Sequence, residues 1–335
     1  MDPLTQGLLG GALAQSVADN NKARPAAIVG FAAALPADFD ILIGSADDPL
    51  LNIEFHRHFT HSLVFIPIGA LIIAPLLWLL LRKHLNFRQV YLYALLGFAT
   101  SGLLDACTSY GTHLLWPFSD ERIAWSIIAI VDPLFTLTLL IALIVGIKYR
   151  KHRPARIGLT LAGAYLLLGL WQQHNALDQA QHLAAQRGHK AERMLVKPTL
   201  GNLVLWRSVY QSGNQFYVDA IRIGPGPNRV YQGESAPQFI LARDRADLAA
   251  DSVLAGDIER FSRLSEFYVA PAPTRENVLI DVRYSMLPTE TAPMWGIDLN
   301  VGSPTEHAQF RVYRDRSSDV KERFIAMLLG QDLID

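Results

Sequence analysis

The residues with the clearest chemical potential form one short segment, His56-Arg57-His58-Phe59-Thr60-His61-Ser62. It holds three of the chain's ten histidines together with an arginine. Imidazole is a preferred zinc ligand and is neutral near pH 7. The segment therefore suggests metal binding, and the alternative interpretation is a histidine-rich polar loop beside a membrane.

Apolar runs that alternate with polar loops indicate the elements that must position this segment. Residues 62–81 carry no charge and are long enough to cross a bilayer as a helix, so the histidines stand where a membrane helix begins. Other apolar stretches cover residues 4–18, 26–35, 90–104, 123–147 and 157–171. Charged residues make up 18% of the chain, below the roughly 25% of an ordinary soluble protein, and the net charge is −1, which gives no reason to expect nucleic-acid binding.

Basic loops set the expected orientation of these helices. Lysines and arginines gather at residues 82–88 and 148–156, and such loops stay in the cytoplasm. Two expected spans separate the loops, which agrees with both lying on one side. Acids and imidazoles then fall together at the opposite face, which is periplasmic: Asp38, Asp40, His56, His61, Asp105 and His113.

These side chains form a donor set drawn from four separate segments. Mixed histidine and aspartate sites suit zinc, with manganese or iron as alternatives, and several carboxylates can hold one to three divalent ions. Such ions activate a water and stabilise the leaving oxygen of a phosphoester. The expected metal ligands are Asp38, Asp40, His56, His61 and Asp105. The expected catalytic residues are Arg57, His113 and Asp132.

Arg57 and Asp132 each have a second interpretation. Arg57 would bind a developing anionic charge, or would extend its guanidinium to the membrane surface. Asp132 interrupts an apolar run, where a carboxylate by default indicates function. The pair Asp132-Pro133 is also typical of an N-cap followed by proline at the first helical position. The sequence leaves both alternatives open.

The second half of the chain has the pattern of a soluble domain. Residues 203–211 and 215–223 form a hairpin signature around Ser212-Gly213-Asn214. Further strands are expected at 237–241, 266–270, 278–286, 294–301 and 308–314, and helices at 256–265 and 318–331. The expected fold is therefore a mostly α polytopic membrane domain over 1–171, a connecting helix over 172–194, and a periplasmic α+β domain with a mainly antiparallel sheet over 195–335.

Four motifs also carry a resemblance to a known family: MDPLTQG at residues 1–7, DFD at 38–40, HRHFTHS at 56–62, and Asp105. They resemble the bacterial membrane-bound metal-dependent hydrolases, polytopic inner-membrane proteins of which the LexA-regulated type is the named example. The resemblance covers roughly residues 1–150. Many relatives have histidine where this chain has Gln6, so one ligand of the family site is lost here or becomes an amide oxygen. More distantly, the family is similar to zinc-dependent phospholipase C, which implies a zinc phosphoesterase.

The sequence thus predicts a metal-dependent hydrolase of the bacterial inner membrane that acts on a lipid or a small phosphoester substrate at the outer face. One alternative is a non-enzymatic envelope protein with a structural metal and a partner-binding periplasmic domain. Another is a transporter that uses Asp105 and Asp132 as a proton relay; it requires inverted internal repeats, and the sequence contains none. The substrate, the role of residues 195–335 and the oligomeric state do not follow from the sequence.

Overall fold

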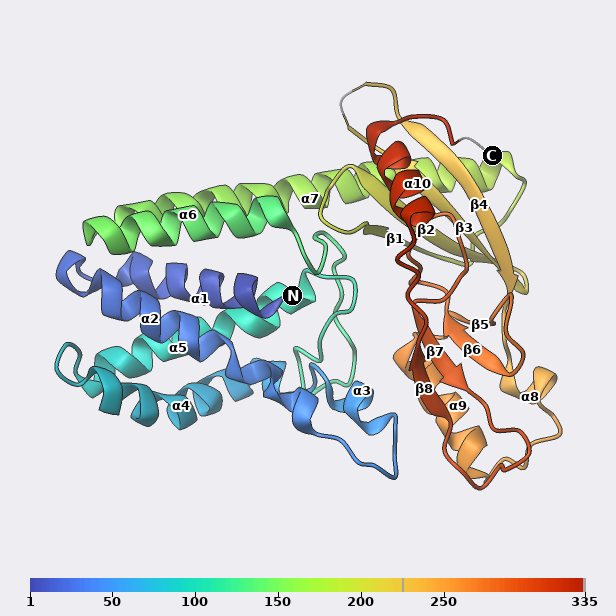
Figure 1. Cartoon of the computed structure of the whole chain (residues 1–335), viewed down its shortest axis with the longest axis horizontal. Coiled ribbons are helices and arrows are strands. Elements are labelled where there is room, and N and C mark those ends of the chain that lie inside the picture. The colour runs from blue at the N-terminus through green and yellow to red at the C-terminus, as the bar shows by residue number, and fades with distance from the viewer. Residues whose placement is uncertain (225, 334–335) are drawn as a thin grey trace. The chain divides into compact units, whose positions relative to one another are not determined.

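The computed structural model describes residues 1–224 and 226–333 (Figure 1). It divides into two compact units. The first comprises Met1–Ile43, Phe55–Trp171 and Leu200–Asn202, and the second comprises Gly44–Glu54, Gln172–Thr199 and Leu203–Asp335. The expected fold class is confirmed, because a helical region with candidate membrane spans precedes a domain with two antiparallel sheets.

The N-terminal half is built from helices and short 3-10 turns. Its elements are α1 (Pro3–Val17), η1 (Asn20–Lys22), α2 (Ala23–Ala34), η2 (Pro36–Leu42), α3 (Leu51–Phe55), η3 (Phe59–His61), α4 (Phe65–Leu81), α5 (Phe87–Ala106), α6 (Pro133–Tyr149) and α7 (Arg153–Gln186). In the first unit, α1, α2, α4 and α5 lie side by side (Figure 1). Three glycines let α1 and α5 pack closely against α2: a Cβ atom on Gly10 of α1 or Gly97 of α5 would overlap the carbonyl oxygen of Gly30 in α2. Small residues at such contacts are typical of packed membrane helices.

Among the described residues, two helical stretches are long and apolar enough to cross a membrane, Asn20–Leu42 and Arg153–Gln186. A third results if Leu51–His61 and Phe65–Leu81, which meet at 87°, count as one span. The run expected to span at 62–81 becomes helical only at Phe65, because residues 59–61 form a 3-10 turn. Its 17 residues make a helix about 25 Å long, shorter than a typical hydrocarbon core.

The second apolar run that differs from expectation is 123–147. Its helix, α6, begins only at Pro133, and Asp132 is the N-cap: its Oδ1 accepts a hydrogen bond from the Phe135 N–H at 3.1 Å. Proline fits the first turn because its missing N–H has no partner there. The capping alternative for Asp132 is therefore the one that the structure shows.

The second unit carries two four-stranded antiparallel sheets. The first, in the order β1-β2-β3-β4, consists of β1 (Arg193–Pro198), β2 (Leu205–Ser212), β3 (Gln215–Arg222) and β4 (Arg229–Pro237). The second, in the order β5-β6-β7-β8, consists of β5 (Val269–Pro271), β6 (Val278–Asp281), β7 (Trp295–Asp298) and β8 (Gln309–Val312). Helices α8 (Leu241–Asp244), α9 (Val253–Leu264) and α10 (Ser318–Leu329) complete the unit.

The expected hairpin is present, since Ser212 pairs with Gln215 across a two-residue turn. The strand expected at 237–241 is not: β4 ends at Pro237, and α8 begins at Leu241. Strand β1 begins within the expected connecting helix, because α7 ends at Gln186 and Gly188 then takes the left-handed conformation that stops a helix.

Residues 44–54 belong to the second unit although first-unit segments flank them on both sides. Leu50 is fully buried in one core with Leu254 and Ile258 of α9. Arg260 of the same helix lies 3.0 Å from an Asp48 carboxylate oxygen and 2.7 Å from one of Glu54. The segment is thus held by both apolar burial and charge.

Candidate metal centre

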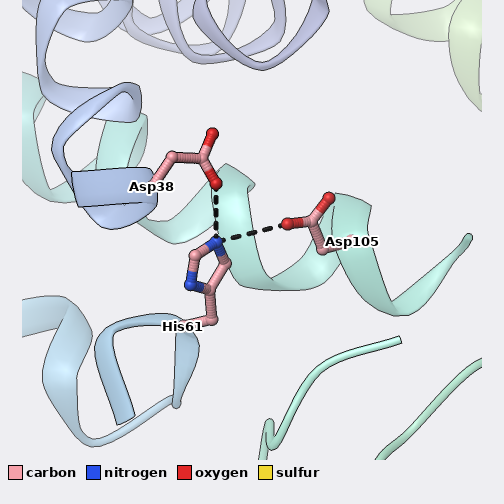
Figure 2. Close-up of side chains that lie close together, drawn as sticks. All are labelled: Asp38, His61 and Asp105. Carbon is pink, nitrogen blue, oxygen red and sulfur yellow. Dashed lines mark hydrogen bonds and ion pairs between the residues drawn. The ribbon is translucent and has the colours of Figure 1, made fainter. Parts of the chain in front are cut away.

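Three side chains from three separate segments of the first unit converge on one point (Figure 2). Asp38 lies in η2, His61 ends η3, and Asp105 is the penultimate residue of α5. The His61 Nε2 atom lies 3.2 Å from Asp38 Oδ1 and 3.2 Å from Asp105 Oδ2. One donor atom from each residue lies within 4.8 Å of the others. These three residues were predicted from the sequence to meet, and the structure brings them together.

His61 can come this close to α5 because the helix has a glycine, Gly102, at the point of contact. Gly102 faces the backbone of η3, and a Cβ atom on it would overlap the carbonyl oxygen of His61. Asp105 follows Gly102 by three residues, which places the two on the same face of the helix. The contact of η3 at Gly102 therefore sets His61 opposite the Asp105 carboxylate.

The two donor separations measured from His61 suit a tetrahedral metal ion. Tetrahedral zinc with ligands at about 2.1 Å separates neighbouring donor atoms by about 3.4 Å. The two separations from His61 Nε2 are both 3.2 Å. His61 and Asp105 are fully buried, whereas the Asp38 side chain is 19% exposed, so solvent reaches the centre beside Asp38. A zinc site that performs chemistry needs one coordination position for water, and Asp38 is the donor with solvent exposure.

Asp40 lies behind His61. Its Oδ2 atom is 3.3 Å from His61 Nδ1, and it accepts hydrogen bonds from the Thr60 hydroxyl at 2.7 Å and from the Arg57 N–H at 2.8 Å. Its Oδ1 atom lies 2.9 Å from Nδ1 of His56. A carboxylate on the far nitrogen of a histidine fixes the ring so that the near nitrogen faces a metal. Asp40 therefore orients His61 and does not join the donor group.

Arg57 is buried against the centre. Its side chain is 6% exposed, which excludes the alternative of an arginine that extends to the membrane surface. Its Nε atom lies 3.1 Å from Asp105 Oδ2, and its guanidinium donates to the Thr108 hydroxyl at 3.3 Å. The residue has a φ of 62°, a strained value for a side chain of this size, and such strain concentrates at functional sites. Hydrogen bonds from the Thr112 hydroxyl and the His113 N–H to its carbonyl hold this conformation.

Gln6 and the amino group of Met1 complete the surroundings of Asp105. The Gln6 amide nitrogen donates to Asp105 Oδ2 at 3.1 Å, and the Met1 amino group pairs with Asp105 Oδ1. The other amide atom of Gln6, Oε1, is buried and has no hydrogen-bond partner among the described residues. An unpartnered buried oxygen on a residue that contacts the Asp105 carboxylate is a feature that a bound cation would satisfy.

Like Asp40, three further residues expected at the site lie outside the donor group. His56 is turned onto Asp40 through its Nδ1 atom. The His113 ring packs 4.6 Å from the ring of His58, and burial together with the charge of Arg122 lowers the pKa of His113 to about 4. Asp132 caps α6, and its second oxygen accepts a 2.9 Å hydrogen bond from the Tyr165 hydroxyl.

Sequence reasoning missed a second arginine near the centre. The guanidinium carbon of Arg122 lies 4.7 Å from the centre of the Tyr110 ring, and that of Arg57 lies 5.3 Å from the same ring. Within the described part of the chain, Arg122 makes no ion pair, and one of its terminal nitrogens is buried without a partner. Nothing in the sequence near Arg122 distinguishes it from other loop arginines.

A second group of possible donors, Asp48, Asp257 and His307, lies in the second unit. Arg260 already bridges its two carboxylates, with ion pairs of 3.0 Å to Asp48 and 3.1 Å to Asp257. This group is accounted for as the anchor of residues 44–54.

Comparison with known proteins gives two matches. The family model described as YdjM inner membrane protein matches residues 1–176, which include Asp38, His61 and Asp105. An uncharacterized protein of Bacillus subtilis (strain 168), YfhP, is 27% identical over 169 residues, and the match covers 50% of each protein. The chain thus spans about half the length of this curated relative. No solved structure matches the chain significantly. Because the family model covers more than half of the residues, the chain belongs to the YdjM family of inner membrane proteins.

Proposed function

We propose that the protein is a membrane-bound metal-dependent hydrolase that binds zinc through Asp38, His61 and Asp105 and cleaves a phosphoester of a lipid or envelope-linked substrate. The observation that carries this proposal is the pair of 3.2 Å separations between His61 Nε2 and the two carboxylates, a spacing that fits one tetrahedral ion. Manganese and iron also bind mixed histidine and aspartate donors, so they are the alternatives to zinc.

A bound zinc ion would supply an activated water and charge stabilisation at neutral pH. The chain's own residues do the remaining work. Asp40 and Thr60 hold the His61 ring in place. The guanidinium groups of Arg57 and Arg122 both lie against the Tyr110 ring. Arg122 would bind the phosphate oxygens of a substrate, and Arg57 would offset the charge that develops during cleavage.

The expected location of this chemistry is the periplasmic face of the membrane. The proposal rests on the positive-inside rule: the basic loops at 82–88 and 148–156 lie on the cytoplasmic side, and the donors lie at the other ends of the helices. The second unit would then also be periplasmic, because α7 leads out of the basic loop toward it.

Metal analysis and a phosphodiesterase assay on the same samples test the proposal. The full chain, purified in detergent, is analysed for zinc by mass spectrometry and assayed with bis(p-nitrophenyl) phosphate and with a panel of phospholipids. His61→Ala should lose the zinc and the activity. The control His174→Ala removes an imidazole that is 71% exposed on α7 and should change neither.

Two outcomes would contradict the proposal. Wild-type protein without stoichiometric metal would exclude the centre itself. Bound metal that depends on His61, with no turnover of any substrate in the panel, would favour a structural metal in a non-enzymatic envelope protein.

A further inference from the structure

The second unit contains a pocket of about 910 Å³ that the metal centre does not use. Its walls come from the segment after β4, from α9 and from the start of β5. Apolar side chains make up most of the lining, among them Phe239, Leu241, Leu248, Phe267 and Val269. The volume lies within the range of known ligand sites, which are mostly apolar with a few placed polar groups.

The charged groups that line the pocket have mainly one sign. Arg193, Arg245 and Arg263 face a single acid, Glu259. Arg245 is paired with Asp247 at 2.7 Å, but Arg263 makes no ion pair within the described residues. The pocket therefore combines an apolar wall with a positive charge that has no acid partner.

A strained turn holds the first of these arginines. Glu266 and Phe267 both have left-handed backbone conformations, with φ values of 49° and 59°. Their carbonyl oxygens each accept a 2.5 Å hydrogen bond from the Arg193 guanidinium, which also lies 4.0 Å from the centre of the Tyr268 ring. The same turn leaves the Phe267 side chain 59% exposed at the pocket. Two consecutive strained residues indicate that the surrounding structure requires this shape.

The backbone N–H groups beside the pocket are already hydrogen-bonded, so they cannot pair with a bound peptide strand. The N–H groups of Gln238, Phe239 and Ile240 donate to Asn214 O, Val269 O and an Asp244 carboxylate, at 2.9, 2.9 and 2.8 Å. A bound peptide strand needs free backbone donors and acceptors along an edge. A ligand can therefore contact this segment only through side chains, which suits a flexible apolar chain and not a peptide.

We propose that this pocket binds a long-chain fatty acid, with its acyl chain along the apolar wall and its carboxylate at Arg263. The charge of Arg263 matches a carboxylate, and the exposed Phe267 and Ile240 side chains would be covered by the chain. The proposal does not depend on the hydrolase activity or on bound metal.

Photo-crosslinking with a diazirine derivative of palmitic acid tests this proposal on the full chain in amphipol. Peptides from residues 238–269 should carry the label, and the apolar helices of the first unit serve as a labelling reference in every sample. Ala250→Trp fills the pocket from an exposed position and should reduce the pocket label at least fivefold relative to this reference. Ala249→Trp is the matched control, because the neighbouring alanine is exposed and does not line the pocket.

The carboxylate is tested separately. Arg263→Gln should reduce the pocket label at least threefold, whereas Arg316→Gln, at an exposed position outside the pocket, should leave it unchanged. The diazirine methyl ester should label the pocket as weakly as the acid labels Arg263→Gln. Equal pocket labelling of Ala250→Trp and Ala249→Trp would overturn the proposal, and so would equal labelling by the acid and the ester.

Discussion

Replacement of Gly102 by alanine should damage the metal centre without touching any donor. The new Cβ atom would overlap the carbonyl oxygen of His61, and neither side can yield easily. Helix α5 is fixed on its other flank, where Gly97 packs against the backbone of Gly30. The η3 turn must therefore retreat, by roughly 1 Å if ordinary van der Waals separation is to be restored.

A retreat of this size exceeds what a metal site tolerates. Ligand distances in zinc sites hold to within about 0.2 Å, so His61 would leave the coordination sphere and two carboxylates would remain. We expect the zinc dissociation constant of Gly102→Ala to rise at least about 100-fold, which corresponds to about 2.8 kcal/mol. Phosphodiesterase activity should fall with it.

Competition against a chromophoric zinc chelator measures this constant in detergent solution, and far-ultraviolet circular dichroism checks that the helices are retained. Gly163→Ala in α7 is the matched control, since a Cβ atom there meets nothing within 4 Å. A Gly102→Ala protein that folds and binds zinc within threefold of wild type would refute the reasoning, because His61 would then not depend on this contact.

Three further changes probe other parts of the chain. Arg122→Gln should raise the KM for a phosphodiester about fivefold or more, with kcat and zinc content unchanged, because only substrate binding loses a charge. Lys197→Met should raise the midpoint of thermal unfolding at pH 7, because burial and then the charge of Arg207 hold the Lys197 pKa well below 10.5. Unfolding of the wild type thus takes up a proton, so its stability rises with pH and the advantage of Lys197→Met shrinks toward pH 10.5. Arg260→Ala should destabilise the second unit by about 3 kcal/mol in chemical denaturation, because it removes the arginine that pairs with the buried Asp257 at 3.1 Å.

Each of these three has a contrary result. A lower kcat with unchanged KM in Arg122→Gln would place this residue in the reaction and not in binding. A Lys197→Met advantage that is constant from pH 7 to pH 10 would mean that the lysine does not titrate on unfolding. For the third, Arg316→Ala removes an exposed arginine of the same unit, and an equal loss in both variants would exclude a specific role for Arg260.

Residue types and the charge rule were enough to predict which residues meet at the centre, but they did not predict the role of each residue. Asp38, His61 and Asp105 were expected together because each ends or begins an apolar run on one side of the membrane. The roles of Asp38 and Asp40 could not be separated, because two positions apart in a 3-10 turn point in different directions and the pattern does not say which faces the centre. Gly102 was not noticed, because its importance comes from a close approach of two segments.

In the second unit, too, features set by local sequence could be predicted, and features set by distant contacts could not. Its hairpin followed from local turn chemistry at Gly213-Asn214. The position of residues 44–54 did not, because burial of Leu50 against α9 depends on partners that lie about two hundred residues later.

Because these partners lie far apart in the sequence, their contact cannot form until long after the first of them has been synthesised. The contact of Glu54 with Arg260 spans 206 positions, so at ordinary elongation rates the ribosome needs roughly 10–40 s to make the second partner after the first. During that interval the stretch that joins Asp38 to His61 has emerged without the helix that later secures it. The anchor of residues 44–54 can therefore form only after Arg260 has been made, when about three quarters of the chain has been translated.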